Sequence, residues 1–193
     1  MSNGDSTQAA ILAAAETLFV AKNYADVSMR EIAREADVST GALYHHFPSK
    51  EKLYYAMLTA YMARLKQASL QVLPADGSCR ARLRALTRVF LALPPAQREV
   101  MRLVRRDLNA FNGRTREGIV RAYQEAVPAL VEQVLSEGIK RKEIRKQDAR
   151  WLAWAFVAIV ETTLNEYAQE RLGGVDAGLD AALDLFLDGA KRK

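Results

Sequence analysis

The sequence predicts an all-α protein of about nine helices, and three observations support this fold class. Five prolines and ten glycines are few for 193 residues, so long stretches contain no helix breaker. Alanine, leucine, arginine and glutamate dominate, and runs of β-branched residues are scarce. Apolar residues recur at intervals of three and four, which places them on one face of a helix. Half of the residues are hydrophobic, enough for a substantial core.

The first expected helix covers residues 7–22. Ile11, Ala15 and Phe19 lie on its apolar stripe, and Asp5 or Ser6 precedes it as a possible N-cap. A short loop follows at residues 23–26. This helix is expected to pack over the next two, which are too short to bury a core by themselves.

Two short helices are expected to meet at a tight turn within residues 28–47. In the first of them, Ser28 is the expected N-cap and Glu31, three residues later, completes a capping box. The turn covers residues 37–39, and Ser39 is the expected N-cap of the second helix, residues 40–46. This arrangement predicts a helix-turn-helix unit, in which the second helix enters the major groove of DNA.

The exposed face of the second short helix carries side chains suited to DNA. Thr40 can bond a base or a phosphate, Tyr44 offers a flat ring with a polar tip, and Lys50 opens the following helix, where a cation suits a phosphate. A solvated face on a helical hairpin, or a protein-interaction module that no longer binds DNA, is the alternative interpretation. The candidate DNA-binding residues are Ser28, Arg30, Ser39, Thr40, Gly41, Ala42, Tyr44, His45 and Lys50.

The segment from Ile11 to about Ala60, which contains the run SMREIAREADVSTGALYHHF, resembles the N-terminal domain of the TetR family of transcriptional regulators. The resemblance implies an all-helical homodimer that binds a palindromic DNA operator, with a divergent C-terminal domain for a small-molecule inducer. Asn23 and Asp37 stand where the family usually has glycine. Both are expected in turns with a left-handed backbone, which Asn and Asp tolerate best after glycine.

Two domains are expected. The DNA-binding domain covers residues 5–65, with its motif at 28–47, and the ligand-binding and dimerisation domain covers residues 78–190. A connecting helix over residues 49–72 joins them, and the family resemblance implies that it moves when inducer binds. Pro74 and Gly77 mark the break after this helix.

The C-terminal domain is expected to contain five helices. Pro95 begins the second of them, and Pro128 is expected to kink the third. The fourth is apolar on nearly every side and must be covered on nearly every side. We therefore expect the last two helices to pair with a second copy in a four-helix bundle. The expected ranges are 79–93, 95–109, 115–137, 151–169 and 176–190.

Positive charge is concentrated in the middle of the chain and not in the DNA-binding segment. Residues 80–121 carry eleven arginines and three acidic residues (11 − 3 = +8), whereas residues 1–70 carry seven of each sign. One hypothesis is an apolar tunnel with a cationic mouth that takes an acyl-CoA or a similar anionic amphiphile. A solvated basic face without a ligand is the alternative, and a neutral or cationic aromatic drug is the competing effector. The candidate ligand-binding residues are Phe90, Arg102, Arg106, Phe111, Tyr123, Trp154, Glu161 and Asn165.

No catalytic or cofactor motif is recognisable, so we expect no enzyme activity, no cofactor and no metal site. His45 and His46 point about 100° apart on a helix, and Cys79 is the only cysteine. The polar start of the chain lacks the basic region of a signal peptide, and the apolar stretch 151–160 is too short to cross a membrane. A cytoplasmic protein is therefore expected.

Together with the family resemblance, the sequence predicts a ligand-released repressor that binds a palindromic operator as a homodimer. A DNA-binding activator without small-molecule control is the alternative. Neither the operator nor the effector follows from the residues.

Overall fold

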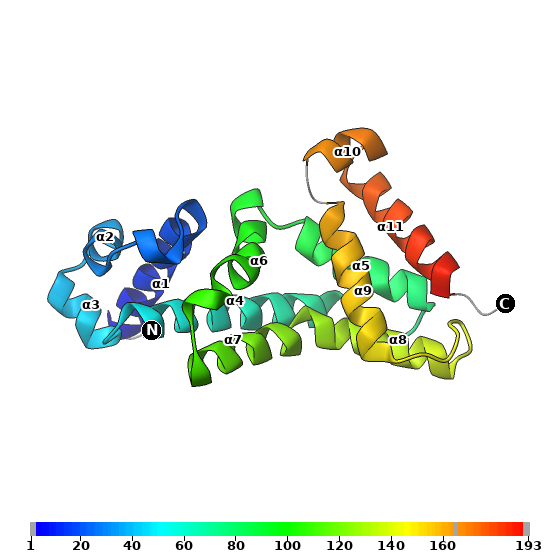
Figure 1. The fold of residues 1–193 in the computed structure, drawn as a ribbon, viewed down its shortest axis with the longest axis horizontal. Helices are drawn as coiled ribbons and strands as arrows, with labels where there is room; N and C mark the ends of the chain where they lie inside the picture. The colour runs from blue at the N-terminus through cyan, green and yellow to red at the C-terminus, as the bar shows by residue number, and fades with distance from the viewer. Residues whose placement is uncertain (1–2, 164–165, 191–193) are drawn as a thin grey trace. The chain divides into compact units, whose positions relative to one another are not determined.

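The computed structural model describes residues 3–163 and 166–190, and this part of the chain contains helices and no strand (Figure 1). The predicted all-α class is confirmed. The described residues form eleven α-helices and two short 3₁₀ helices, more than the nine helices expected. They are α1 (Asn3–Ala21), η1 (Tyr24–Asp26), α2 (Met29–Glu35), α3 (Thr40–His46), α4 (Lys50–Val72), α5 (Cys79–Leu91), α6 (Pro95–Asp107), η2 (Leu108–Ala110), α7 (Gly113–Glu125), α8 (Val127–Lys140), α9 (Ala149–Thr162), α10 (Glu166–Leu172) and α11 (Val175–Ala190).

The helices form two compact units that alternate along the chain. The first unit combines the residues up to 64 with residues 94–123, so α6, η2 and α7 pack with the N-terminal helices. The second unit combines residues 65–93 with the residues from 124 onward. Helix α4 contributes residues to both. No helix of the described residues is long and apolar enough to span a membrane.

An aromatic cluster lies in the core of the first unit. The ring centroid of Tyr54 lies 4.9 Å from that of Phe19, 5.1 Å from that of Tyr24 and 5.0 Å from that of Phe111. The Tyr54 hydroxyl donates a hydrogen bond of 3.0 Å to a carboxylate oxygen of buried Asp107. Burial, together with this carboxylate, raises the pKa of Tyr54 far above its usual value. The cluster packs α1 against α4 within this unit, and the hydrogen bond to Asp107 adds α6.

The core of the second unit lies between α5, α8, α9 and α11. Gly138 of α8 lets the helices approach closely, since a Cβ atom at this position would lie only 3.0 Å from the sulfur of Cys79. Burial raises the pKa of the Cys79 thiol to about 12, so this cysteine acts as a small apolar residue. The buried residues of this core include Leu83, Leu86, Leu130, Val134, Leu152, Phe156, Leu183 and Phe186.

Two long helices of the sequence analysis are each divided in the structure. The expected helix 115–137 is broken, not kinked, because Ala126 between α7 and α8 has a non-helical backbone, with ψ of −121°. Pro128 then lies in the first turn of α8, where its missing N–H has no helical partner to lose. The expected helix 151–169 ends at Thr162, and α10 is a separate helix. Gly173 and Gly174 follow α10 with φ of 83° and 106°, a backbone that favours glycine.

Three smaller expectations at the N-terminal turns had different outcomes. Asp37 has the expected left-handed backbone, with φ of 53°. Asn23 does not, because its φ is −67°; its side-chain amide donates to Asp26 instead. Asp5 and Ser6, the expected N-caps, lie inside α1, which begins at Asn3. Asp37 therefore replaces glycine for the expected reason, and Asn23 does not.

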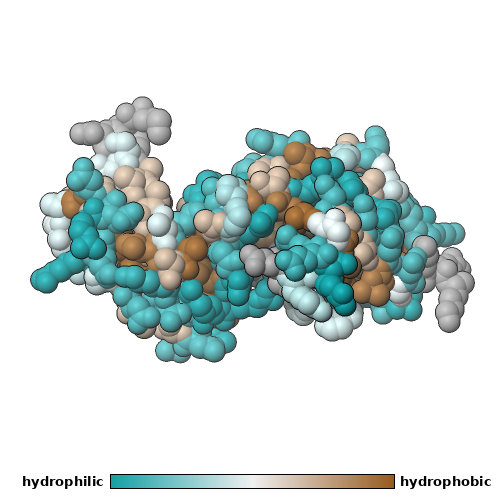
Figure 2. All heavy atoms as spheres, turned by 90° about the horizontal axis from the view of Figure 1, so that it is seen from above, coloured by the Kyte–Doolittle hydropathy of each residue, from teal (hydrophilic) through white to brown (hydrophobic). Residues whose placement is uncertain are grey.

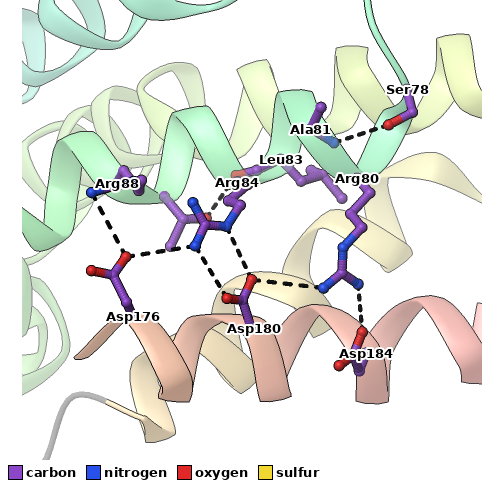
Figure 3. Close-up of polar contacts among 10 residues, drawn as sticks. Ser78, Arg80, Ala81, Leu83, Arg84, Arg88, Asp176, Asp180 and Asp184 are labelled. Atoms are coloured by element: carbon purple, nitrogen blue, oxygen red, sulfur yellow. Dashed lines mark hydrogen bonds and ion pairs between the residues drawn. The ribbon is translucent and has the colours of Figure 1, made fainter. Parts of the chain in front are cut away.

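Arginines of α5 make ion pairs with α11 and α8, and none of these partners was predicted from the sequence. Arg82 is only 4% exposed; it bonds Glu137 of α8 and donates to the carbonyl oxygen of Pro74. The other three form what we call the Arg–Asp ladder along α11 (Figure 3). Its pairs are Arg80 with Asp180 and Asp184, Arg84 with Asp176 and Asp180, and Arg88 with Asp176.

Candidate nucleic-acid interface

Helix α2 begins at a complete capping box, as the sequence predicts. The Ser28 hydroxyl accepts from the Glu31 backbone N–H at 3.2 Å, and the Glu31 carboxylate accepts from the Ser28 N–H at 2.8 Å. Lys22 at the end of α1 donates to the same carboxylate at 2.8 Å. The hydrogen bonds from Lys22 and Ser28 lower the pKa of Glu31 to about 2. Both ends of the α1–α2 connection are thereby fixed.

The turn into α3 is also fixed by backbone groups. The Val38 N–H donates to the Ala33 carbonyl oxygen at 2.9 Å, and Asp37 supplies the left-handed residue that ends α2. The Ser39 hydroxyl accepts from the Ala42 N–H at 3.1 Å and caps α3. Leu43 is completely buried and anchors α3 on the unit's core. The orientation of α3 therefore depends on one cap, one turn and one buried leucine.

The opposite face of α3 is exposed and polar. Thr40, Gly41 and His45 are exposed, and the Tyr44 side chain is 48% exposed. Ala42 is partly buried, and Ser28 and Arg30 of the preceding segment are exposed. Hydroxyl, phenol and imidazole groups from the N-terminal turns of one helix can bond base edges and phosphates. The structure thus brings the predicted residues of α2 and α3 to neighbouring positions of one helix-turn-helix.

Lys50 has a different position from the one expected for a phosphate ligand. Its ammonium donates to the carbonyl oxygens of Tyr24 at 2.7 Å and Val27 at 2.8 Å, with a longer bond to Ala25. It also lies 4.4 Å from the centre of the Tyr24 ring. Burial lowers the pKa of Lys50, whereas the nearby carboxylates of Asp26 and Glu31 oppose this shift. In this structure Lys50 stabilises the α1–α2 loop.

Sequence reasoning missed this supporting role because the three carbonyls lie 23 to 26 residues before Lys50. Every residue has a backbone carbonyl, so no pattern in the sequence indicates which carbonyls a lysine will bond. Tyr24 links the two features in the structure, since its ring lies both in the aromatic cluster and beneath the Lys50 ammonium.

The candidate ligand-binding residues are divided between the two units. Arg102, Arg106, Phe111 and Tyr123 belong to the first unit, in which Phe111 is buried in the aromatic cluster. Phe90, Trp154 and Glu161 belong to the second unit, and Asn165 lies outside the described residues. The Trp154 ring is 46% exposed and donates to Gln124 at 2.8 Å. The set therefore draws four described residues from the first unit and three from the second.

Comparison with known families agrees with this geometry. The family model of the bacterial regulatory proteins, tetR family, matches residues 11–57, which include α2 and α3. The model of the tetracyclin repressor-like C-terminal domain matches residues 76–170. The chain belongs to the TetR family.

Curated TetR-type relatives and solved structures resemble the chain to different extents. The transcriptional activator FasR of Mycolicibacterium smegmatis is 38% identical over 86 residues, 45% of this chain and 39% of FasR. The transcriptional repressor KstR2 of Rhodococcus jostii is 25% identical over 182 residues, 93% of this chain and 88% of KstR2. The match thus spans about two fifths of FasR but most of KstR2. The crystal structure of AibR with isovaleryl coenzyme A and operator DNA has a TM-score of 0.75 at 23% identity, covering 93% of this chain and 97% of AibR, and supports the fold.

Proposed function

We propose that the chain is a transcriptional regulator that binds operator DNA through α2 and α3. One observation carries this proposal: α3 buries Leu43 completely and leaves the Tyr44 ring, about 100° further round the helix, half exposed. A helix fixed on one face with polar residues on its N-terminal turns is the arrangement that reads the major groove in helix-turn-helix proteins. The names of FasR and KstR2 agree with a role in transcription.

The test is selection of bound duplexes from a random library, followed by affinity measurement on the selected sequence. Replacing Tyr44 by Ala is expected to weaken binding by about tenfold or more, since a specific contact contributes about 1–3 kcal/mol. The matched control is Tyr167→Ala, which removes an exposed tyrosine ring from the second unit. Equal affinity of the Tyr44 variant and the wild type would contradict the proposal.

We further propose that the chain acts as a homodimer through α9 and α11. Both helices belong to the second unit and keep large apolar side chains exposed, with Trp151 at 59% and Leu185 at 69%. Figure 2 shows apolar side chains reaching the visible surface in patches among hydrophilic ones. A second copy would cover such faces in a four-helix bundle. Sedimentation velocity tests this, because Leu185→Glu is expected to give monomers.

A dimer is needed for a palindromic operator, in which the two recognition helices lie about 34 Å apart. In the selection experiment above, an inverted repeat among the enriched sequences supports the dimer, whereas single half-sites contradict it. The Leu185→Glu variant is expected to lose affinity for the repeat and to keep its folded core, since Leu185 is exposed.

For the effector, we propose a small molecule that releases the protein from DNA, with an acyl-CoA as the first candidate. The AibR structure holds isovaleryl coenzyme A together with operator DNA. Thermal unfolding against acyl-CoAs of several chain lengths, free fatty acids and aromatic cations separates the possibilities. A Tm increase that grows with acyl length supports the lipid-type effector, and an increase with aromatic compounds alone supports a drug-type effector.

Activation in place of repression is a second candidate, which the name of FasR favours. Transcription in vitro from a promoter that carries the selected operator distinguishes the two. A repressor lowers transcript levels until effector is added, and an activator raises them.

A further inference from the structure

A cavity of about 370 Å³ lies in the first unit between α1 and α6. Its apolar lining residues are Val20 from α1 and the buried Leu103 from α6. Its charged side chains come from successive turns of α6. They are Glu99, Arg102, Arg105 and Arg106.

Arg102 is available for another acceptor. Its Nη1 group bonds the Glu99 carboxylate at 2.9 Å, whereas its Nε and Nη2 groups make no hydrogen bond with a described residue. A guanidinium can bind a carboxylate or phosphate through two parallel bonds. The pair with Glu99 lies at the surface and is weak, so an incoming anion can replace it.

Arg106 is held in place and connects the cavity with α1. Its Nη2 group donates to the carbonyl oxygens of Phe19 at 2.7 Å and Lys22 at 2.8 Å, which belong to the C-terminal end of α1. Its Nε and Nη2 groups also bond buried Asp107 at 2.9 Å. The Arg106 guanidinium thus satisfies helix-end carbonyls that have no partner within the helix.

Hydrogen bonds continue from Arg106 to the DNA-binding motif. Lys22, whose carbonyl accepts from Arg106, donates through its own ammonium to Glu31. Glu31 in turn forms the capping box with Ser28 at the start of α2. A hydrogen-bonded path therefore runs from the cavity through the end of α1 to the first helix of the helix-turn-helix.

We propose that this cavity binds a small organic anion, a carboxylate or a phosphate ester, through Arg102 and Arg106. A charged oxygen is a stronger acceptor than a peptide carbonyl, so the anion competes with Phe19 and Lys22 for Arg106. Weaker bonds to α1 loosen Lys22 and, through it, the start of α2. Bound anion therefore lowers operator affinity. This consequence rests on the proposed DNA binding, whereas anion binding itself does not.

Calorimetric titration with citrate and with inorganic phosphate tests the site, with ionic strength held constant by sodium chloride. Arg102→Gln is expected to weaken citrate binding about tenfold through loss of a charge-assisted contact. Glu99→Gln is expected to strengthen it by removing the competing carboxylate. Arg116→Gln on exposed α7 makes the same charge change as Arg102→Gln outside the cavity and is expected to have no effect. Equal effects of the Arg102 and Arg116 variants would overturn the proposal.

Operator affinity measured with and without citrate tests the hydrogen-bonded path from Arg106 through Lys22 to α2. Citrate is expected to weaken operator binding by the wild type but not by Lys22→Met, which keeps the Lys22 carbonyl and loses the bond to Glu31. If the wild type binds no DNA even without citrate, the proposed function fails and the calorimetry still decides the anion site. If Arg102→Gln weakens DNA binding in citrate-free buffer, the cavity takes a DNA phosphate and the small-anion proposal is overturned.

Discussion

The helix-turn-helix and the α5–α11 contact are both stabilised by polar side chains, but at very different sequence distances. In α2 and α3 each cap joins residues three apart, Ser28 with Glu31 and Ser39 with Ala42. In the second unit Arg84 bonds Asp180, 96 residues away. The first kind of interaction depends on local backbone geometry, and the second depends on how whole helices pack. Substitutions that remove one kind of interaction or the other should differ in how much they lower stability and in how far through the protein their effect extends.

The largest effect is expected from Arg82→Met in the second unit. This change leaves Glu137 without its cation and the Pro74 carbonyl without its donor. Arg82 is buried but the Glu137 carboxylate is partly exposed, so breaking this pair on one side is expected to lower the free energy of unfolding by about 2 kcal/mol. Both tryptophans, Trp151 and Trp154, belong to this unit, so urea unfolding followed by tryptophan fluorescence reports it.

The double variant Arg82→Met with Glu137→Leu is the control for this experiment. Since the unpaired charge is then removed, it is expected to recover most of the lost stability. If the double variant is no more stable than the single one, packing of the Arg82 stem, and not the ion pair, is responsible.

The contrast between near and distant partners also explains what could be predicted from the sequence. The capping box at Ser28, the cap at Ser39 and the left-handed Asp37 were predicted and are confirmed, because each follows from residues within one turn. The partners of Arg82 and Lys50 were not predicted. The sequence does not indicate which distant carboxylate or backbone carbonyl a given cation will bond. The breaks at Ala126 and after Thr162 were missed because apolar spacing continues across both.

A smaller effect is expected from Ser28→Ala, which removes the α2 cap. Loss of an N-cap hydroxyl lowers stability by about 1 kcal/mol. The effect should remain local, with faster amide hydrogen exchange at Glu31 and in the rest of α2. Exchange in α5 and α8 of the second unit should be unchanged. Faster exchange in both units would show that the cap stabilises more than its own helix.

The Arg–Asp ladder is expected to contribute less per pair, because its side chains are largely exposed and screened by salt. Arg84→Ala and Asp180→Ala are each expected to lower Tm by no more than about 2 °C. In the double-mutant cycle the coupling should fall as sodium chloride is raised. The Arg82 effect should persist at high salt, since that guanidinium is buried. If the coupling does not depend on salt, the ladder pairs are shielded from solvent in the same way as the Arg82–Glu137 pair.

The smallest effect is the acid sensitivity of the α2 capping box. Glu31 has a pKa of about 2 in the folded protein, below its ordinary value of 4.5, because of its bonds to Lys22 and Ser28. Its stabilising contribution is therefore complete above about pH 4.5 and is lost as the pH falls toward 2. Hydrogen exchange in α2, corrected for its intrinsic pH dependence, should rise over this range in the wild type. In Glu31→Gln the exchange should be faster at neutral pH and nearly independent of pH, because the amide keeps an acceptor oxygen but has no charge to lose. If both proteins respond alike, another carboxylate controls the start of α2.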